Sequence, residues 1–570
     1  MPNRNNVGRW NLLIRSGIIV VVMGLACRSL RLLSITTSEL LEKKHLTQRP
    51  QDETSAPRQE YRGEKTMPSS PDNDVLPKLG KLVCEKYGGP SEAASQEMVY
   101  WRDFPEDREY KSPFRSSKNE KKRKYVSVVM DAGGFNNIRM QVEIAMAFAH
   151  ATGRTFIIPP RQGIYLLEDT YSLHDFYNLD GLDVIEMEDF LKQEVMSASI
   201  RDKKGHRVFP PGNRTDWTSN APREDIFEED QADSRQLDYF MRTLGKSPEF
   251  LPRDKLIFVP KRPTTGHQIT KWVKFAQELE DEQDNTKSIE RRTGSKWLNS
   301  PTPVNASTKK RLEEVIQDRK LWPYDEALHR ARLIYFMADD EKWIRLMTLF
   351  YYALFFEDWK MDLVVKRYVR DRLRYRDELF CAAARIVERM RERSRKHGNG
   401  GRFYTYHVRR NDFAHIDLFE SAEALLVDTE DVVPRNATVY IATDEKDKSW
   451  FDPLRKRFHV YFLDNFLHDI KDLSSSYYGI LDEIVATRGE VFVGAYSSTF
   501  TSHIIHMRGY YSQVEKKPGW EMGILNSSYF ATKEFKYIFQ RYRSFGFDDV
   551  MDSGAYPIAW RDIDKGIGLL

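Results

Sequence analysis

The stretch YVSVVMDAGGFNNIRMQVEIAMAFAHATGRTFIIPP, residues 125–160, decides the fold class of this chain. YVSVVM at its start and TFIIPP at its end predict buried strands. Apolar groups between them recur at helical spacing: Ile138, Val142, Ala145 and Ala149. Gly153 is a natural end for that helix. Strand, turn, helix and strand within 36 residues form a βαβ unit, which implies a parallel sheet with a right-handed crossover.

A second and more regular alternation follows the glycine-rich stretch HGNGG, residues 397–401. It predicts strands at FYTYHVRR, TVYIATDE, VYFL and EVFVGAY, and helices at KSWFDPLRKRF, YGILDEIVATRG and SSTFTSHIIHMRGY. We therefore predict an α/β fold of two Rossmann-like, doubly wound lobes, at residues 96–397 and 398–570. Ligands are expected in the cleft between the lobes, at the carboxyl ends of the strands.

The region between these two patterns has a weaker periodicity. Charge-rich pieces within residues 184–327 predict loops or exposed helices that are inserted in the first lobe. KWIRLMTLFYYALFF (342–356) and RYRDELFCAAARIVERMRERSRK (374–396) predict a helical block, which HGNGG ends.

Composition limits the classes of protein to which the chain can belong. Of its 570 residues 41% are hydrophobic and 30% charged, so a substantial core is expected. Lys and Arg total 88 against 85 Asp and Glu, a balance that argues against nucleic acid as a partner. Because Cys27 lies in an N-terminal apolar segment, at most one bridge is left for the folded part, between Cys84 and Cys381. A disulfide framework and a Cys-rich zinc site are excluded.

The N-terminus has the features of a targeting segment. SGIIVVVMGLAC (16–27) is apolar, and its extension to residues 12–33 would form a helix of about 33 Å, enough to span the hydrocarbon layer. We predict a cytosolic tail and signal anchor in residues 1–35 and a stem or linker in residues 36–95. A cleavable signal peptide and a core helix are the alternatives. Either targeting route leads to the secretory lumen, which four Asn-x-Ser/Thr triplets fit: Asn213, Asn305, Asn436 and Asn526.

The turn DAGGFNN (131–137) joins the first predicted strand to its helix. Gly133 and Gly134 permit positive φ and a close approach of the backbone, and the helix is expected to start at about Asn136. The free N–H groups of that helix would form a corner for an anion or a sugar. A tight turn without a ligand explains this motif equally well.

Two adjacent arginines follow the first strand of the second lobe, in HVRRNDF (407–413). Because successive side chains of a strand face opposite ways, Arg409 and Arg410 cannot both face the cleft. We expect one guanidinium to face a ligand and the other to be held by an acid such as Asp412. The fork of a guanidinium suits a diphosphate, although an ion-paired or solvated arginine pair is the common alternative. His407 is interpreted as a hydrogen-bonded core histidine rather than a base.

Hydroxyl groups gather in GAYSSTFTSHI (494–504), between a predicted strand and a predicted helix. Ser498 and Thr499 would cap the helix, or offer hydroxyl and N–H groups to a phosphate. The sequence contains no metal-binding motif. A bound diphosphate would therefore have to be neutralised by arginine and by helix termini.

Acidic residues occur at two further positions of the second lobe. Asp444 follows the predicted strand TVYIATDE at its carboxyl end. Asp482 and Glu483 lie on a predicted helix. Either of these two acids could accept hydrogen bonds from a purine, or pair with Arg488 or a helix cap.

Together these segments, in this order, resemble the GDP-fucose protein O-fucosyltransferase superfamily. GGFNNIRMQVEIAMAFAHATGRTFIIPP is similar to its first motif, and HVRRNDF to its His-x-Arg-Arg-x-Asp-Phe element. VYIATDE, DEIVATRGEVFVGAYSSTF and MRGYY are similar to its C-terminal block. The resemblance covers about residues 126–160 and 403–511. It implies a two-lobed GT-B fold and an inverting, metal-independent transfer of fucose from GDP-fucose to a hydroxyl of a protein or glycan.

The resemblance also implies roles for single residues. Arg409 matches the arginine on the β-phosphate, and Asp482 matches the acid that reads guanine. Some members carry a glutamate base where this chain has Gly133, so the base is left open. The residues expected to be catalytic are Arg409 and Asn137. Those expected to bind substrate are Gly133, Gly134, Phe135, Asn136, Arg139, His407, Arg410, Asp412, Asp444, Asp482, Ser498, Thr499 and Phe500.

The resemblance implies partners and a compartment as well. We expect a sugar nucleotide and a protein or glycan acceptor as partners, and no cofactor or metal. A single-pass anchor would hold the chain in the Golgi or endoplasmic reticulum membrane, with its catalytic part in the lumen. A transferase that uses another sugar nucleotide, such as a rhamnosyl donor, and a non-catalytic relic that binds a sugar nucleotide or glycan are the alternatives.

Overall fold

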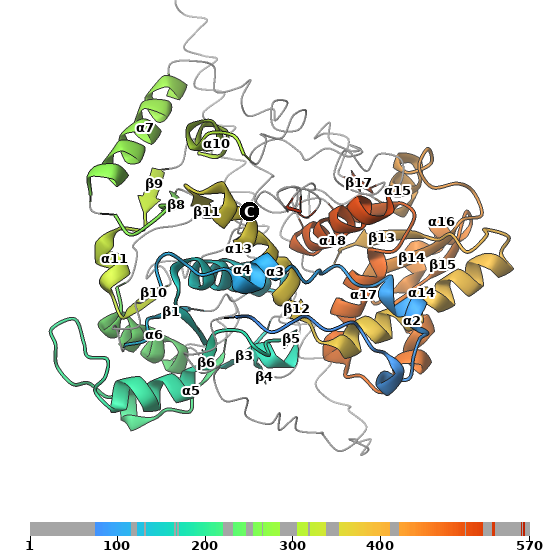
Figure 1. Cartoon of the computed structure of the whole chain (residues 1–570). Helices are drawn as coiled ribbons and strands as arrows, with labels where there is room; N and C mark the ends of the chain where they lie inside the picture. Colours follow the sequence, from blue (N-terminus) through green and yellow to red (C-terminus); the bar gives the residue numbers. More distant parts are fainter. Residues whose placement is uncertain are drawn as a thin grey trace, which may run out of the picture. The chain divides into compact units, whose positions relative to one another are not determined.

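The structure is a computed structural model, and the part of the chain that it describes is shown in colour in Figure 1. The described residues are 75–115, 122–129, 133–164, 167, 170–220, 232–246, 255–264, 266–284, 305–316, 320–337, 353–410, 421–495, 498–516, 527–530, 560, 563 and 564. All of them belong to one compact unit, Thr66–Leu570. Among these residues, no helix has both the length and the apolar character needed to cross a bilayer. The predicted signal anchor and Asp412 lie outside the described residues.

The first lobe is built on a four-stranded parallel sheet in the order β10-β1-β2-β6. Its strands are β1 (Tyr125–Val128), β2 (Thr155–Ile158), β6 (Val184–Glu186) and β10 (Leu333–Phe336). Helix α4 (Phe135–Thr152) connects β1 with β2, which confirms the predicted βαβ unit. Gly153 ends α4 with a φ of 63°, and a Cβ there would lie 2.7 Å from the Arg115 backbone. Only glycine therefore fits this helix end.

A smaller parallel sheet combines two strands from residues 184–327, which the sequence predicted as loops or exposed helices, with one strand from the predicted helical block. Its strands are β8 (Lys255–Val259), β9 (Lys320–Pro323) and β11 (Leu354–Phe356), in the order β11-β8-β9. Phe258 and Phe355 stack at 6.0 Å in a core that α7 (His267–Asp284) and α10 (Thr308–Val315) share. The predicted helix over 342–356 is wrong for its last three residues, which form β11. A short apolar run fits a buried strand as well as a buried helix, and neighbouring strands decide between them.

The second lobe is built on a five-stranded parallel sheet in the order β15-β14-β13-β16-β17. Its strands are β13 (Tyr404–Val408), β14 (Thr438–Thr443), β15 (His459–Tyr461), β16 (Phe492–Ala495) and β17 (Ser527–Phe530). Its helices include α15 (Ala422–Asp428), α16 (Asp452–Arg455), α17 (Tyr478–Ala486) and α18 (Thr499–Glu515). The predicted alternation of strands and helices is thus confirmed, and β13 is the central strand.

The described part of the chain contains further helices and strands. The helices are α2 (Glu92–Gln96), α3 (Pro105–Glu109), α5 (Met187–Phe190), α6 (Ala232–Leu244), α11 (Glu326–Arg330) and α13 (Trp359–Arg372). The strands are β3 (Arg161–Gly163), β4 (Thr170–Tyr171), β5 (Tyr177–Asn178), β7 (Thr218–Asn220) and β12 (Arg374–Tyr375). β3 pairs with β4 and β7, and β5 pairs with β12.

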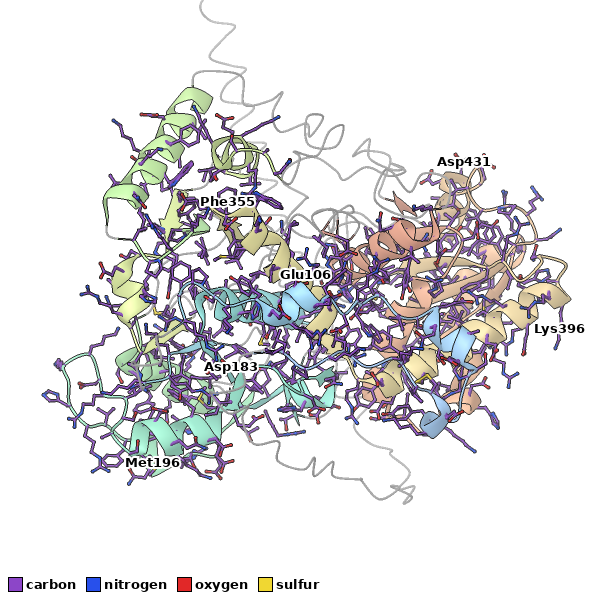
Figure 2. The ribbon with its side chains drawn as sticks, viewed as in Figure 1. Glu106, Asp183, Met196, Phe355, Lys396 and Asp431 are labelled. Atoms are coloured by element: carbon purple, nitrogen blue, oxygen red, sulfur yellow. A yellow bond between two sulfur atoms is a disulfide. The ribbon has the colours of Figure 1, made fainter. Side chains whose placement is uncertain are left out.

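Helix α14 (Asp377–Lys396) packs against α17 and β14, so it covers the sheet of the second lobe. Figure 2 shows Lys396, its last residue, at the periphery of this lobe. A disulfide joins Cys381 of α14 to Cys84, and Leu82 is buried beside it. Within the segment expected to be a stem, Leu82 and Cys84 are therefore part of the folded core. The lobe boundaries at 96–397 and 398–570 stay predictions.

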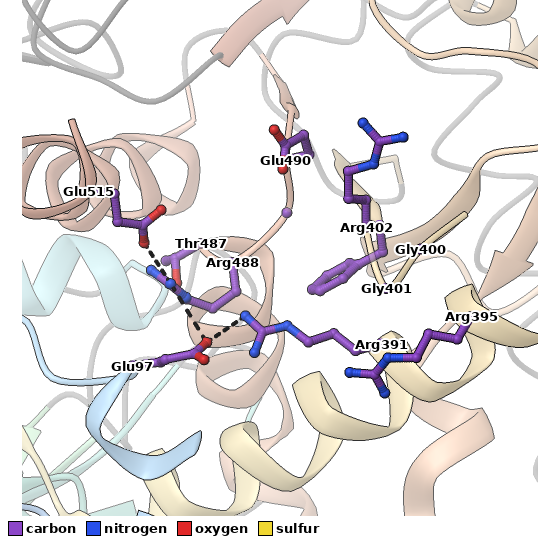
Figure 3. Close-up of a pocket in the computed structure, with 12 residues that line it drawn as sticks. Glu97, Arg391, Arg395, Gly400, Gly401, Arg402, Thr487, Arg488, Glu490 and Glu515 are labelled. Atoms are coloured by element: carbon purple, nitrogen blue, oxygen red, sulfur yellow. Dashed lines mark hydrogen bonds and ion pairs between the residues drawn. The ribbon is translucent and has the colours of Figure 1, made fainter. Parts of the chain in front are cut away.

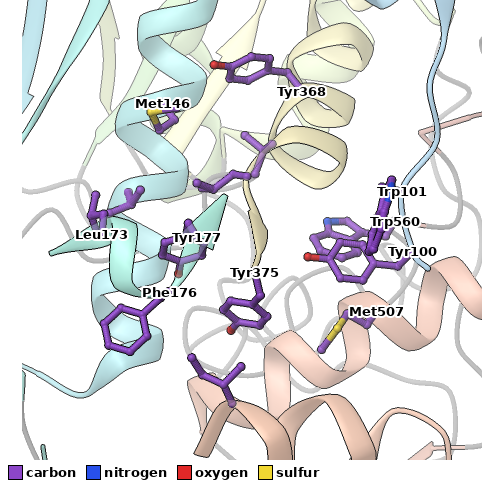
Figure 4. Packing of buried hydrophobic residues seen from close by; sticks show 14 of the residues in the cluster. Tyr100, Trp101, Met146, Leu173, Phe176, Tyr177, Tyr368, Tyr375, Met507 and Trp560 are labelled. Carbon is purple, nitrogen blue, oxygen red and sulfur yellow. The ribbon is translucent and has the colours of Figure 1, made fainter. Parts of the chain in front are cut away.

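Aromatic side chains fill the core between α4 and α18 (Figure 4). Tyr375 stacks on Tyr177 with ring centroids 5.5 Å apart, and Phe135 of α4 lies 6.0 Å from the same ring. Tyr100 packs 5.1 Å from Trp560. These rings hold the start of α4 in a fixed place relative to α18.

Candidate functional site

Arg409 follows directly after β13, the central strand of the second sheet. β14 and β16 run parallel to β13 on its two sides, so the carboxyl ends of all three strands lie at one edge of the sheet. Asp444 follows β14, and Ser498 lies between β16 and α18. The structure therefore brings three of the predicted motifs to one edge, where parallel sheets bind ligands.

His407 is a buried histidine of β13 with a fixed hydrogen-bond partner. Its Nδ1 lies 2.8 Å from the Thr501 hydroxyl, and its ring centroid lies 4.4 Å from that of Phe500. Burial first, and then the positive charge of Arg409, lower the pKa of His407 to about 3. The imidazole is therefore neutral, as interpreted from the sequence, and it supports the start of α18 rather than acting as a base. The effect of Arg409 on this pKa also shows that its charge lies near His407.

Arg410 is held by the protein itself. Its Nε lies 2.8 Å from Glu445 Oε2, its guanidinium carbon lies 4.4 Å from the centre of the Trp450 ring, and its backbone N–H donates to Asp444 Oδ1 at 2.8 Å. The expectation that an acid holds one of the two arginines is met by Glu445. Both side chains take part in this local network, and the role in substrate binding expected of Arg410 and Asp444 stays a prediction.

The N-termini of α4 and α18 meet at the same place. Thr499 Oγ1 donates to Asn137 Oδ1 at 3.1 Å, which joins the first turn of α18 to the first turn of α4. Neither helix has a side-chain cap: Gly134 precedes α4 and Ser498 precedes α18. The first N–H groups of a helix have no partner within it, and they carry a partial positive charge. Two uncapped N-termini side by side therefore form a surface suited to an anion.

Two buried polar atoms close to these helix starts have no hydrogen-bond partner among the described residues. They are Ser498 Oγ and Asn136 Oδ1. Buried polar atoms in native proteins normally have a partner. A hydroxyl-rich or phosphate-bearing ligand, or water, would supply one.

Gly134 and Phe135 lie at the start of α4. Gly134 was expected to allow positive φ, and Phe135 was expected to bind substrate. Gly134 has a φ of −65°, so the turn does not use positive φ at this residue. A Cβ at Gly134 would meet no atom within 4 Å, which leaves open space in front of the helix. Phe135 packs its ring 4.7 Å from Phe176, as part of the aromatic core.

Arg139 lies in a buried polar network rather than at a surface open to substrate. Its Nε donates to Glu143 Oε1 at 2.9 Å, and its Nη1 donates to Tyr375 Oη at 2.6 Å. The Tyr375 hydroxyl donates in turn to Glu483 Oε2 at 2.6 Å, and Asn136 also bonds to Glu483. Burial raises the pKa of Glu483 to about 7. The side chain of Arg139 is only 3% exposed and orders α4 from within the core, and its expected contact with substrate stays a prediction.

Asp482 of α17 contacts β14 through Tyr440. The Tyr440 hydroxyl donates to Asp482 Oδ1 at 2.5 Å. Desolvation raises the pKa of Asp482 to about 7, although the hydrogen bond from Tyr440 opposes this shift. Of the partners considered from the sequence, Arg488 is excluded, because it pairs with Glu515 at 2.7 Å. Asp482 remains partly exposed and can accept further hydrogen bonds.

Sequence reasoning missed Tyr375, Tyr440 and Thr501 as members of this region. Tyr375 and Tyr440 have no local signal, because the acids that they contact are more than forty residues away along the chain. Thr501 lies within the hydroxyl-rich stretch 494–504 and could have been included with it. In the described part of the chain, no three His, Cys, Asp or Glu side chains come together as metal ligands. Metal independence stays a prediction.

The chain matches a known protein family. A model of the family described as GDP-fucose protein O-fucosyltransferase matches residues 125–511, from the start of β1 to α18. The match thus includes the whole four-stranded sheet, the five-stranded sheet without its edge strand β17, and every described residue of the site. None of the curated proteins matches the chain.

Similar solved structures are fucosyltransferases. NodZ alpha-1,6-fucosyltransferase co-crystallised with GDP is 14% identical, over 72% of this chain and 96% of that chain, with a TM-score of 0.31. Fucosyltransferase NodZ from Bradyrhizobium is also 14% identical, over 72% of this chain and 96% of that chain, with a TM-score of 0.31. POFUT1 in complex with GDP-fucose is 13% identical, over 73% of this chain and 99% of that chain, with a TM-score of 0.29. At these TM-scores the likeness carries no argument about the site.

Proposed function

The chain belongs to the GDP-fucose protein O-fucosyltransferase family, and we propose that this glycosyltransferase moves fucose from GDP-fucose to a hydroxyl of a protein or glycan acceptor. The observation that carries the proposal is the contact between Thr499 and Asn137, beside the end of β13. This contact joins two uncapped helix N-termini next to the strand end that Arg409 follows. Such a place suits the diphosphate of a sugar nucleotide.

In the proposed reaction, breakage of the bond between fucose and phosphate leaves developing negative charge on the β-phosphate. Arg409 and the N–H groups at the starts of α4 and α18 stabilise this charge. Donors that are fixed before the reaction stabilise the transition state more than the ground state. The proposal therefore needs no metal ion for the leaving group, and the fucose carbon is attacked with inversion in a GT-B arrangement of the two lobes.

The two adjacent arginines take different parts in this proposal. Arg410 is neutralised by Glu445 and stacks on Trp450, so it anchors the loop that follows β13. Arg409, whose charge lies near the buried and neutral His407, is assigned to the β-phosphate. In this proposal, the Arg410 guanidinium stabilises the loop after β13, and the Arg409 guanidinium binds the nucleotide.

Asp482 is proposed to read the base. Guanine presents two neighbouring N–H groups, and a carboxylate accepts both of them. The partial exposure of Asp482 and its raised pKa fit an acid that gains binding partners when the base arrives. The catalytic base and the acceptor are not assigned.

The lumen of the Golgi or endoplasmic reticulum is the compartment that we propose. The disulfide between Cys84 and Cys381 supports it, because disulfides persist in oxidising compartments. The anchor of residues 12–33 remains part of the proposal.

Two measurements test this function. Calorimetric titration of the purified lumenal part with GDP, UDP and ADP is expected to show binding of GDP alone. Hydrolysis assays with a panel of sugar nucleotides are expected to give turnover with GDP-fucose. Preference for another donor would favour the rhamnosyl-type alternative, and GDP binding without turnover of any donor would favour a non-catalytic relic.

A further inference from the structure

A pocket lies at the other edge of the sheet in the second lobe, away from the proposed donor site. It has a volume of about 500 Å³, within the usual range of ligand sites. Its walls include residues 400–403, which precede β13, and residues 489–490, which precede β16. Arg409, by contrast, follows the other end of β13, so a five-residue strand of roughly 16 Å separates the two sites. This pocket is therefore not part of the proposed donor site.

Charged side chains from several elements meet in the pocket (Figure 3). Four are arginines: Arg391, Arg395, Arg402 and Arg488. Three are glutamates: Glu97, Glu490 and Glu515. The pocket therefore has one more cation than anions, and its lining contains only one aromatic residue, Phe403, which is buried. Such a lining suits a polar ligand with a negative charge.

Two of the glutamates already have arginine partners. Glu97 Oε2 lies 2.5 Å from Arg391 Nη2 and 4.0 Å from Arg488 Nη2, and Glu515 Oε1 lies 2.7 Å from Arg488 Nη2. Figure 3 shows this chain of contacts along one wall. The pairs fix the wall and leave the other arginines for a ligand.

Arg488 is the buried cation of this wall. Its side chain is 7% exposed, and its guanidinium carbon lies 4.1 Å from the centre of the Tyr511 ring. Its Nε and Nη1 are enclosed and have no hydrogen-bond partner in the part of the chain that the structure describes. Both groups lie beneath the surface of the pocket, so Arg488 adds positive charge to this wall without contacting a ligand.

Arg395 and Arg402 lie on the exposed rim of the pocket. Neither has a carboxylate within 4.0 Å among the described residues, and Figure 3 draws no contact for them. Arg395 Nε lies 3.4 Å from the position that a Cβ of Gly401 would take, and Gly401 has a φ of 84°. Glycine at 401 thus allows the Arg395 guanidinium to lie across the rim.

We propose that this pocket binds a saccharide with one anionic group, either a carboxylate or a sulfate ester. The anionic group is held by Arg395 and Arg402 at the rim of the pocket. The carboxylate of Glu490 and the backbone of residues 400–401 and 489 offer partners for sugar hydroxyls. The saccharide part of the proposal rests on the proposed function, because an acidic glycan would engage a glycosyltransferase at a second place. The anion part rests on the pocket alone.

The test is calorimetric titration of the purified full-length protein with four probes: glucuronic acid, galactose 6-sulfate, galactose and inorganic sulfate. At least one charged sugar is expected to bind more tightly than galactose and than inorganic sulfate. Which of the two binds identifies the anionic group. Arg395→Ala and Arg402→Ala are each expected to weaken this binding at least about tenfold.

Arg389→Ala is the matched control for these variants. Arg389 is also an exposed arginine of α14, but it pairs with Glu392 and Asp469 and does not line the pocket. This variant is expected to bind the charged sugar like the parent protein. All three variants are expected to keep the affinity for GDP, because the donor site lies at the other end of β13.

Three outcomes would overturn the proposal. These are no binding of either charged sugar, equal binding in the parent and in both rim variants, or binding of inorganic sulfate as tight as that of the charged sugars. The proposed function can fail independently of this proposal. A protein that binds the acidic sugar but not GDP would refute the proposed function, while the proposal for this pocket would still hold.

Discussion

Tyr375 and Glu483 share a buried hydrogen bond of 2.6 Å, in which the tyrosine hydroxyl donates to the carboxyl group. The same hydroxyl oxygen accepts from Arg139 of α4, so one atom joins α4 to α17. Figure 4 shows Tyr375 between the elements that it connects. Behind the proposed donor site, the two helices are thus held by a polar contact as well as by aromatic packing.

Replacement of Tyr375 with Phe is expected to lower the free energy of unfolding by about 1–3 kcal/mol, because Glu483 and Arg139 both lose a buried partner. Urea unfolding followed by circular dichroism measures this change. Tyr477→Phe is the control, since no hydrogen bond of the Tyr477 hydroxyl is found in the described structure, and its stability should stay within about 0.5 kcal/mol of the parent. Equal stability of both variants would contradict the role of the Tyr375 hydroxyl.

The stability of the protein is expected to depend on pH through Glu483. Burial raises the pKa of this residue from 4.5 to about 7, so between these values the folded state keeps a proton that the unfolded state has lost. Its contribution is therefore fully present below pH 4.5 and is lost as the pH rises through about 7. The free energy of unfolding should fall across this window by up to about 3 kcal/mol.

In the Glu483→Gln variant, residue 483 cannot titrate. Its free energy of unfolding should therefore fall less between pH 5 and 8 than that of the parent, as measured by urea unfolding at several pH values. Glu392→Gln, a change at an exposed glutamate, serves as the control and should keep the slope of the parent protein. An unchanged slope in Glu483→Gln would show that this carboxyl does not titrate in the window.

Arg409→Lys is expected to fold normally but to lose turnover of GDP-fucose by about 10²–10³-fold. Lysine keeps the charge but not the fork of donors that fits a phosphate. Steady-state kinetics give the loss, and circular dichroism checks the fold. Arg389→Lys, a change outside both sites, should retain full activity. Undiminished turnover in Arg409→Lys would remove this residue from the mechanism.

Thr499→Val removes the hydroxyl that contacts Asn137 while it keeps the volume of the side chain. We expect kcat/KM for GDP-fucose to fall by up to about tenfold, because the two helix N-termini are less well aligned. Thr499→Ser retains the hydroxyl and should restore most of the activity. The interpretation fails if the serine variant loses as much activity as the valine variant.

Chelation of divalent cations is expected to leave transfer unchanged, because arginine and helix N-termini are proposed to neutralise the leaving group. The assay compares initial rates with and without EDTA, and again after addition of magnesium or manganese. Loss of activity with EDTA that either metal restores would require a metal ion in the mechanism.

The parts of this fold that repeat a regular pattern could be predicted from the sequence. The unit in residues 125–160 and the alternation after residue 403 each contain strands and helices with a clear period, and both are present. The sheet of β8, β9 and β11 could not be predicted, because its strands are short apolar runs far apart in sequence. Such runs gain their conformation only from neighbours in space.

Part of the candidate site could also be predicted from the sequence. The motifs around Asn137, Arg409 and Thr499 could be found, because each one ends a strand or begins a helix. The partner of Arg410 could be predicted as an acid but not as Glu445, which follows the neighbouring strand. The burial of Arg139 could not be foreseen either, since Tyr375 and Glu483 come from distant segments.

The bond between Cys84 and Cys381 closes a covalent ring that contains both parallel sheets of the first lobe, because the two residues are 297 positions apart. A protease that cuts once inside this ring leaves two fragments that still migrate together on a gel until a reducing agent is added. Loops in this stretch can thus be nicked while the enzyme remains a single covalent molecule.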